Sequence, residues 1–215
     1  MGFLRWLRPY LSRKYVSLFL VIIGIALLVY VASAYWDMFH TQRTLEAQWE
    51  QQAAAAAKSS PGVKTVSADE LLTRVVIPKI NLDSIVVEGV SHRQLSIGPG
   101  HLKDTATPGE PGNAVISGHR DTFFRHIYEL QKGDDIMIRR NGQVFRYQVT
   151  GKRIVPPDDV SVLKPTRDAQ LTLITCYPTY YIGPAPKRLV IFSKLVDSGS
   201  EGQPAAQPVS ATTNQ

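Results

Sequence analysis

One uncharged apolar segment near the N-terminus constrains this chain more than any other feature. No charged residue occurs between Lys14 and Asp37, and residues 16–34 read VSLFLVIIGIALLVYVASA. A helix needs about 20 apolar residues to cross the hydrocarbon core of a bilayer. Tyr15 and Trp36 flank the run, where aromatic rings favour the membrane interface. We therefore predict a transmembrane helix at residues 15–36.

The charges before this segment predict its orientation. Arg5, Arg8, Arg13 and Lys14 precede it, with no acidic residue among them. Because basic residues favour the cytoplasmic side of a membrane, we expect a cytoplasmic tip at residues 1–14 and an extracytoplasmic location for all that follows the helix. The alternative is a cleaved signal peptide, since the small residues 32–34 (Ala-Ser-Ala) could form a cleavage site.

Composition divides the rest of the chain into a stalk, one folded domain and a tail. Residues 43–57 are rich in helix formers, and residues 58–62 (KSSPG) then break the helix. We expect a helical stalk and linker at residues 37–70 and the folded domain at residues 71–197. The small polar residues 198–215 cannot bury enough apolar surface to fold and are predicted to be disordered.

Short β-branched segments separated by turn signals predict an all-β domain. Asn141-Gly142 is a strong hairpin signal, because both residues tolerate a positive φ angle. Within the domain only residues 122–130 look helical. Closely spaced strands favour a small antiparallel or mixed barrel. We expect strands at residues 74–77, 84–87, 113–117, 135–140, 143–150, 171–176 and 188–194.

The formal net charge of +6 does not indicate nucleic-acid binding. Four of the positive charges belong to the N-terminal tip, and no basic block with interleaved aromatic residues occurs elsewhere. No Cys/His cluster has the spacing of a zinc site, so we expect no metal and no other cofactor.

Cys176 is the single cysteine and ends an apolar strand. Tyr177-Pro178 must then leave the sheet, because proline cannot continue a central strand. Outside the cytoplasm structural cysteines usually pair, and here no second cysteine exists. Cys176 is therefore either a buried small hydrophobe or a reactive thiol beside a groove. Thiol attack on a carbonyl also needs a proton carrier and a donor to the oxyanion.

His119 and Arg188 are the candidates for these two roles. His119 follows the strand at residues 113–117, and imidazole exchanges protons near neutral pH. Arg188 begins the last strand and could donate two hydrogen bonds into the same groove if that strand pairs beside Cys176. Taken alone, His119 is better explained as a surface or hydrogen-bonded structural residue, and Arg188 as a surface charge at a strand edge. The other histidines, His40, His92, His101 and His126, have less defined settings, with His92 and His101 placed in loops.

Ser-Gly-His, Thr-Leu-Ile-Thr-Cys and an arginine twelve residues later together resemble the sortase family. Residues 172–176 match its T-L-x-T-C motif, the likeness spans roughly residues 75–196, and Cys-Tyr-Pro with Gly-Pro-Ala-Pro-Lys-Arg is most similar to class D. The resemblance implies a closed eight-stranded β-barrel with short helices behind one transmembrane helix. It implies Cys176 as nucleophile, His119 as general acid/base, Arg188 as substrate and oxyanion ligand, and Thr175 as a substrate-positioning residue.

The resemblance also implies a reaction and its partners. Such enzymes cleave an LPxTG-like signal near the C-terminus of a secreted protein and hold the acyl part as a thioester. An amine, such as a cell-wall precursor or a pilin lysine, then takes the acyl group. Some sortases bind calcium beside the groove, and Asp104, Glu110, Asp158 and Asp159 are the loop acids that could do so here, although loop acids are ordinarily just solvated.

Several alternatives stay open. The barrel could bind extended peptides without catalysis, or a cysteine hydrolase could use water as the acceptor. An L,D-transpeptidase would need a His-Gly-Cys arrangement, whereas Ile174-Thr175 precede Cys176 here. A free thiol titrates near pKa ~8.5 and a free imidazole near ~6.5. A thiolate–imidazolium pair therefore requires either mutual shifts or catalysis by a minor population.

Overall fold

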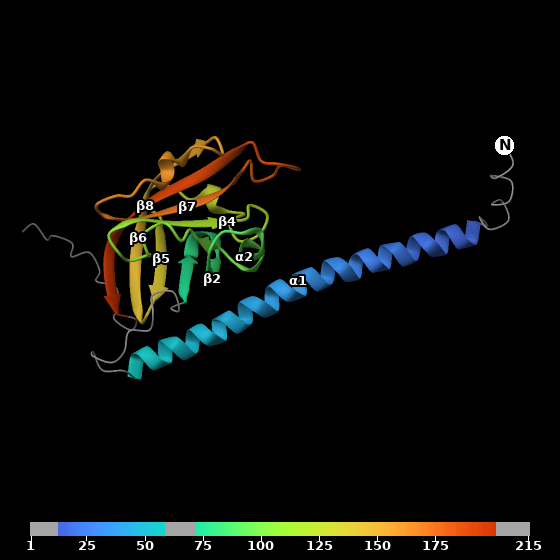
Figure 1. Ribbon diagram of the computed structural model, residues 1–215, viewed down its shortest axis with the longest axis horizontal. Coiled ribbons are helices and arrows are strands. Elements are labelled where there is room, and N and C mark those ends of the chain that lie inside the picture. The colour runs from blue at the N-terminus through green and yellow to red at the C-terminus, as the bar shows by residue number, and fades with distance from the viewer. Residues whose placement is uncertain (1–12, 59–71, 201–215) are drawn as a thin grey trace, which may run out of the picture. The chain divides into compact units, whose positions relative to one another are not determined.

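The computed structural model describes residues 13–58 and 72–200 (Figure 1). These residues divide into two compact units, with the boundary between Arg43 and Thr44. Helix α1 (Arg13–Lys58) contains the apolar segment. Within it, Tyr15–Gln52 includes a stretch of mean hydropathy 2.7, long and apolar enough to cross a membrane. A signal sequence meets the same criterion. Most of the predicted tip and linker, and residues 201–215 of the tail, lie outside the described residues.

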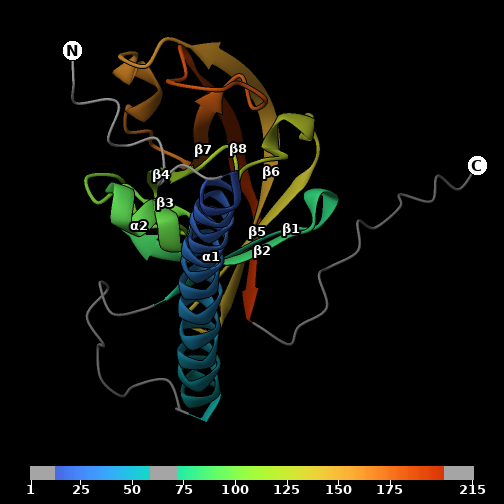
Figure 2. The same cartoon turned by 90° about the vertical axis from the view of Figure 1, so that its right-hand side faces the viewer.

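The described strands of the second unit close into a mixed barrel in the order β1-β2-β3-β4-β7-β8-β6-β5 (Figures 1 and 2). The β2–β3 and β4–β7 pairs are parallel and the remaining pairs are antiparallel. The prediction of an all-β barrel is therefore confirmed. The strands are β1 (Thr73–Ile77), β2 (Leu82–Glu88), β3 (Gly100–His101), β4 (Gly112–Gly118), β5 (Asp135–Arg140), β6 (Gln143–Val155), β7 (Ala169–Tyr177) and β8 (Lys187–Ser200), with short helices η3 (Pro78–Ile80), α2 (His92–Ile97), η4 (Ile127–Glu129) and η5 (Val160–Leu163) between them.

The hairpin prediction is confirmed at the β5–β6 turn. Arg140 pairs with Gln143, and Asn141 and Gly142 between them have φ angles of 52° and 69°. Strands β6 and β8, which pair with each other, are both longer than predicted. Ser200 pairs with Gln143, so residues 198–200 belong to β8 rather than to a disordered tail. Their order comes from the β6–β8 ladder, in which backbone groups provide the hydrogen bonds whatever the side chains are.

Two local predictions were wrong. Residues 122–130 form turns and the short helix η4 instead of one α-helix. The reason is the spacing of Phe124, Ile127 and Leu130, which are fully buried and three residues apart, as suits three residues per turn. The structure also contains an unpredicted helix, α2, where the Ser91 hydroxyl accepts a hydrogen bond from the Gln94 backbone in a capping box.

Side chains of adjacent strands separate into an interior face and an outer face, because they alternate along each strand. The main core fills the barrel and includes Ile116, Leu173 and Ile191 of neighbouring strands. A second, smaller apolar cluster covers the outer face of β7 and β8 and joins Val190 to Val162 of η5. The loop between β6 and β7 therefore packs against the outside of the same two strands.

Candidate active site

Three adjacent strands bring their ends together at one edge of the barrel. Figure 2 shows β7 and β8, in orange and red, running side by side. The parallel pair β4–β7 aligns Gly118 with Thr175, and the antiparallel pair β7–β8 aligns Cys176 with Arg188. The condition set for Arg188, that the last strand pairs beside the strand of Cys176, is therefore met. His119, which directly follows β4, belongs to this edge as well.

The register also places Cys176 and Arg188 on the outer face. They lie directly opposite each other, and such residues point to the same side with Cβ atoms about 4.5–5.5 Å apart. Two residues before Cys176 on that face lies Ile174, a member of the outer apolar cluster. Continuing the alternation of β4 by one residue assigns His119 to this face too. Cys176 is a free, half-buried thiol, so it is not sealed in the core.

The guanidinium of Arg188 is turned partly onto its own chain. Its Nη1 donates to the carbonyl of Ala185 at 3.2 Å and to that of Lys187 at 3.0 Å. One nitrogen of the fork is thus held by backbone oxygens. Since guanidinium carries five N–H donors, others remain to bind a further acceptor.

His119 lies half-buried beside a second histidine. The rings of His92 and His119 meet edge to face, with centroids 5.8 Å apart and planes at 64°. Burial lowers the pKa of His119, the positive charge of His92 lowers it further, and Asp121 opposes the change. At neutral pH the neutral imidazole is therefore favoured more than in a free histidine.

Thr175 joins the cysteine strand to the histidine strand. Its side chain is on the interior face, 1% exposed, and its hydroxyl donates to the carbonyl of Gly118 at 2.7 Å. Gly118 itself has no room for a side chain, because a Cβ there would lie 2.7 Å from the ring of Phe124. The backbone on both sides of the site is therefore held by close packing and a buried hydrogen bond.

Asn113 holds the loop that borders the outer face. It is 5% exposed, and its Nδ2 donates to the carbonyls of Val162 at 3.0 Å and Lys164 at 3.2 Å. Its Oδ1 accepts a hydrogen bond from Thr172 at 2.7 Å. Because η5 packs on the outer face of β7 and β8, this anchor fixes the loop that covers part of the face to which Cys176 belongs.

Sequence reasoning missed His92 and Arg120. His92 was assigned to a loop, whereas it is the first residue of α2. The Ser91/Gln94 capping box was the signal that could have revealed this helix. Arg120 is buried and hydrogen-bonds to backbone carbonyls 58 and 63 residues further along the chain. No local pattern predicts contacts of that kind.

The other histidines of the barrel serve elsewhere. His101 is bonded through Nδ1 to Glu88 at 2.9 Å and through Nε2 to the carbonyl of Ala106 at 3.0 Å. His126 Nδ1 lies 2.8 Å from Glu129. Among residues 13–58 and 72–200, no group of three or more His, Cys, Asp or Glu side chains is arranged to hold a metal ion.

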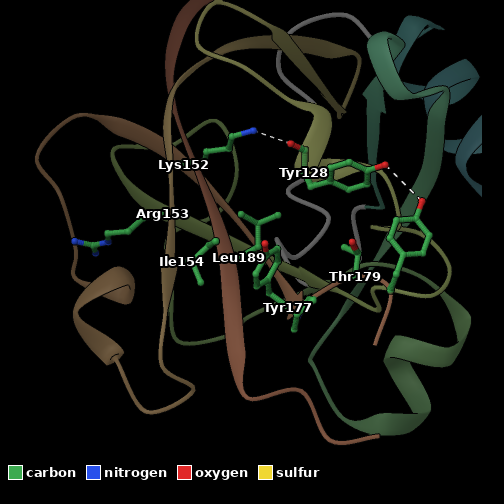
Figure 3. A pocket seen from close by; sticks show the side chains of 9 residues that line it. Tyr128, Lys152, Arg153, Ile154, Tyr177, Thr179 and Leu189 are labelled. Atoms are coloured by element: carbon green, nitrogen blue, oxygen red, sulfur yellow. Dashed lines mark hydrogen bonds between the residues drawn. The ribbon is translucent and has the colours of Figure 1, made fainter. Parts of the chain in front are cut away.

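A pocket of about 530 Å³ lies behind the candidate site (Figure 3). Cys176, His119 and Arg188 do not line it; Tyr177 and Leu189, their neighbours on the alternate face, do. In Figure 3 the side chain of Arg153 points away from Tyr177 and Leu189. The Tyr128 and Tyr180 hydroxyls, 3.4 Å apart, form another part of the lining, and this hydrogen bond raises the pKa of Tyr128 to about 12. The pocket is thus separate from the face that carries the thiol.

A family model described as the sortase domain matches residues 75–196. The chain belongs to the sortase family. It is 35% identical over 196 residues to Sortase D of Bacillus subtilis, covering 86% of this chain and 99% of the relative. The structure of a Clostridium perfringens Sortase D5 transpeptidase aligns with a TM-score of 0.58 and 26% identity, over 74% of this chain and 97% of the other. Sortase E1 of Streptomyces coelicolor, solved with a tripeptide in the active site, aligns with a TM-score of 0.57 and 27% identity, over 66% and 99% of the two chains.

These likenesses confirm the family and the enzyme class inferred from the sequence motifs. This protein is a sortase cysteine transpeptidase with a closed, eight-stranded mixed barrel and a long apolar N-terminal helix. The T-L-x-T-C motif lies on β7, in the middle of the three strands whose ends meet. As a member of this family, the sortase acts on proteins that carry sorting signals.

Proposed function

We propose that this sortase cleaves an LPxTG-like signal of a secreted protein at Cys176 and transfers the acyl group to an amine. The observation that carries the proposal is the strand register, which puts Cys176 opposite Arg188 and Thr175 opposite Gly118, the residue before His119. The tripeptide in the active site of the Streptomyces coelicolor sortase E1 supports a peptide substrate. Class D specificity is supported by the identity to Sortase D of Bacillus subtilis.

The first half-reaction makes a thioester. The neutral imidazole of His119 takes the proton of the Cys176 thiol, and the sulfur attacks the scissile carbonyl carbon. Arg188 donates hydrogen bonds to the oxyanion that forms, as a permanently charged and planar donor. His119 then returns its proton to the leaving nitrogen as the carbon–nitrogen bond breaks. The C-terminal fragment departs as an amine.

The second half-reaction reverses these roles. An amine of a cell-wall precursor or a pilin lysine attacks the thioester carbon, and His119 accepts its proton. As the carbon–sulfur bond breaks, His119 passes this proton to the sulfur, which restores the Cys176 thiol and the neutral imidazole. Thr175 takes part from the interior face, by keeping the end of β7 against the end of β4 through its bond to Gly118.

A peptide assay with two acceptors tests this proposal. The purified full-length protein is mixed with a fluorogenic LPxTG-type peptide library, with and without an oligoglycine amine or hydroxylamine. Cys176→Ala should abolish turnover, and a mass increase equal to the acyl fragment should appear on the wild type. His40→Ala, in α1, is the matched neutral control. Product formed only with water would indicate a hydrolase, and peptide binding without a Cys176-dependent product would indicate a binding module.

We also propose that α1 anchors the enzyme with its N-terminus in the cytoplasm and the barrel outside. Four basic residues before the apolar segment support this orientation. Since the chain has a single cysteine, intact cells expressing it can be treated with a membrane-impermeant methanethiosulfonate. Labelling of the wild type but not of Cys176→Ala is the expected result. Labelling only after lysis would place the barrel in the cytoplasm.

A further inference from the structure

Arg120 directly follows the histidine of the candidate site, but its side chain serves the loop between β7 and β8. This loop, residues 178–186, joins the strand that carries Cys176 to the strand that carries Arg188. Arg120 is only 9% exposed. Since burying a charged group is costly unless its donors are paired, the partners of Arg120 indicate its role.

The guanidinium of Arg120 bridges the two halves of the loop. Its Nη1 donates to the carbonyl of Pro178 at 3.0 Å and its Nη2 donates to the carbonyl of Gly183 at 2.7 Å. A planar, charged fork with two acceptors fixes the direction as well as the distance of its partners. Asp121, 3.7 Å from the Nε atom, is exposed and adds little.

Arg188 is attached to the same stretch of backbone. Its Nη1 donates to the carbonyl of Ala185, two residues after the glycine that Arg120 holds. The path of residues 183–185 therefore positions one of the two backbone carbonyls that hold the guanidinium of Arg188, the other being that of Lys187. A change at Gly183 reaches Arg188 through one short run of backbone.

Burial does not fix the tip of this loop. Tyr180, Tyr181 and Ile182 are exposed, and Ile182 is 101% exposed. Arg125 approaches the tip from the side, with its guanidinium 5.8 Å from the Tyr180 ring centroid. Arg120 makes a similar contact, 5.8 Å from the Tyr181 ring centroid, but it also holds the backbone of the loop through two hydrogen bonds.

We propose that Arg120 is a positioning residue, which holds the β7–β8 loop so that Arg188 is directed at the reacting peptide. The inference rests on the proposed function, because it takes Arg188 as the ligand of substrate and oxyanion. Arg120 itself touches no reacting atom in this arrangement. Its loss should therefore reduce turnover of the peptide without changing the intrinsic reactivity of the thiol.

A matched pair of variants tests the inference. Arg120→Met and Arg125→Met remove the same charge next to the same loop, but only the first removes bonds to its backbone. Arg120→Met should lower kcat/KM for the peptide between about tenfold and 100-fold, as expected when a reacting group is misplaced. Arg125→Met should stay within about twofold, as is usual for exposed sites away from special contacts. The rate at which iodoacetamide alkylates Cys176 should be the same in both variants and the wild type.

A double-mutant cycle separates positioning from general destabilisation. If Arg120 acts through Arg188, Arg120→Met should lower kcat/KM by a much smaller factor in the Arg188→Lys background than in the wild type. The reason is that the effects of coupled residues are not additive. An equal loss in both backgrounds, or a parallel fall in the alkylation rate, would overturn the inference. If Arg120→Met does not fold, Arg120→Lys replaces it in the same measurements. Lysine keeps the charge but can hydrogen-bond to one of the two carbonyls at most. Cys176-dependent turnover by the wild type is judged separately, so failure of the proposed function is distinguishable.

Discussion

The Thr175 hydroxyl donates a buried hydrogen bond of 2.7 Å to the Gly118 carbonyl, across 57 residues of sequence. One of these residues precedes Cys176 and the other precedes His119. The bond therefore links the backbone that presents the thiol to the backbone that presents the imidazole. Neither partner needs to touch a substrate for this link to matter.

Thr175→Val should destabilise the barrel, because valine has the same shape but no donor. The loss of a buried hydrogen bond predicts a fall in the free energy of unfolding of about 1–3 kcal/mol, measurable by urea denaturation. Thr175→Ser keeps the hydroxyl and should retain more of the peptide cleavage rate than Thr175→Val. Equal cleavage by the two variants would contradict the link.

Gly118→Ala should lower the free energy of unfolding, although the φ angle of Gly118 is not positive and does not by itself require glycine. The added Cβ would lie 2.7 Å from the Phe124 ring. The backbone of Phe124 is held in the turn after β4, because its N–H donates to the carbonyl of His119 at 3.0 Å. Overpacking of this kind costs about 1–3 kcal/mol. Gly151→Ala is the control, since no atom lies within 4 Å of a Cβ there. In thermal unfolding followed by circular dichroism, Gly118→Ala should have a clearly lower Tm than Gly151→Ala.

His92→Phe should raise the pKa of His119. Phenylalanine keeps an aromatic ring in place but removes the positive charge that lowers this pKa, so the imidazolium persists to higher pH. NMR titration of ring-labelled histidines, assigned with His119→Gln, measures the change directly. An unchanged titration of His119 would refute it.

The same variant also distinguishes two mechanisms of activation. In both mechanisms the acidic limb of the pH profile of kcat/KM should move to higher pH as the pKa of His119 rises. If a minor thiolate–imidazolium population is the active form, a larger imidazolium fraction should also raise the plateau. If neutral His119 removes the thiol proton during attack, the plateau should not rise. The full pH profile of wild type and His92→Phe provides the comparison.

Asn113→Ala should release the loop that borders the thiol face. Two hydrogen bonds to Val162 and Lys164 are lost, so hydrogen exchange at residues 160–164 should become faster. KM for the peptide should rise more than kcat falls, because the change affects a loop on the thiol-bearing face rather than a reacting group. Thr166→Ala removes only a bond to Asp168 inside the same loop and should have a smaller effect. Unchanged exchange at η5 would show that Asn113 is not its anchor.

Local patterns predicted much of the fold. The β5–β6 hairpin follows from Asn141-Gly142, whose φ angles are both positive, and the strands of the core follow from short β-branched segments separated by turn signals. The length of β8 did not follow, because residues 198–200 are ordered by pairing with β6 rather than by their own composition. The α-helix expected at residues 122–130 was wrong because the buried residues Phe124, Ile127 and Leu130 follow a period of three.

The sequence by itself determined which reactive groups are present: one thiol, a histidine and an arginine at the ends of apolar strands. These strands follow a segment long enough to span a bilayer. Each of these is a local property of residue type and spacing. Only the tertiary structure decided which groups surround them, because closing the barrel aligns β4 in parallel with β7 and brings distant residues into contact. The approach of His92 to His119 and the bonds of Arg120 to Pro178 and Gly183 exist only after that closure.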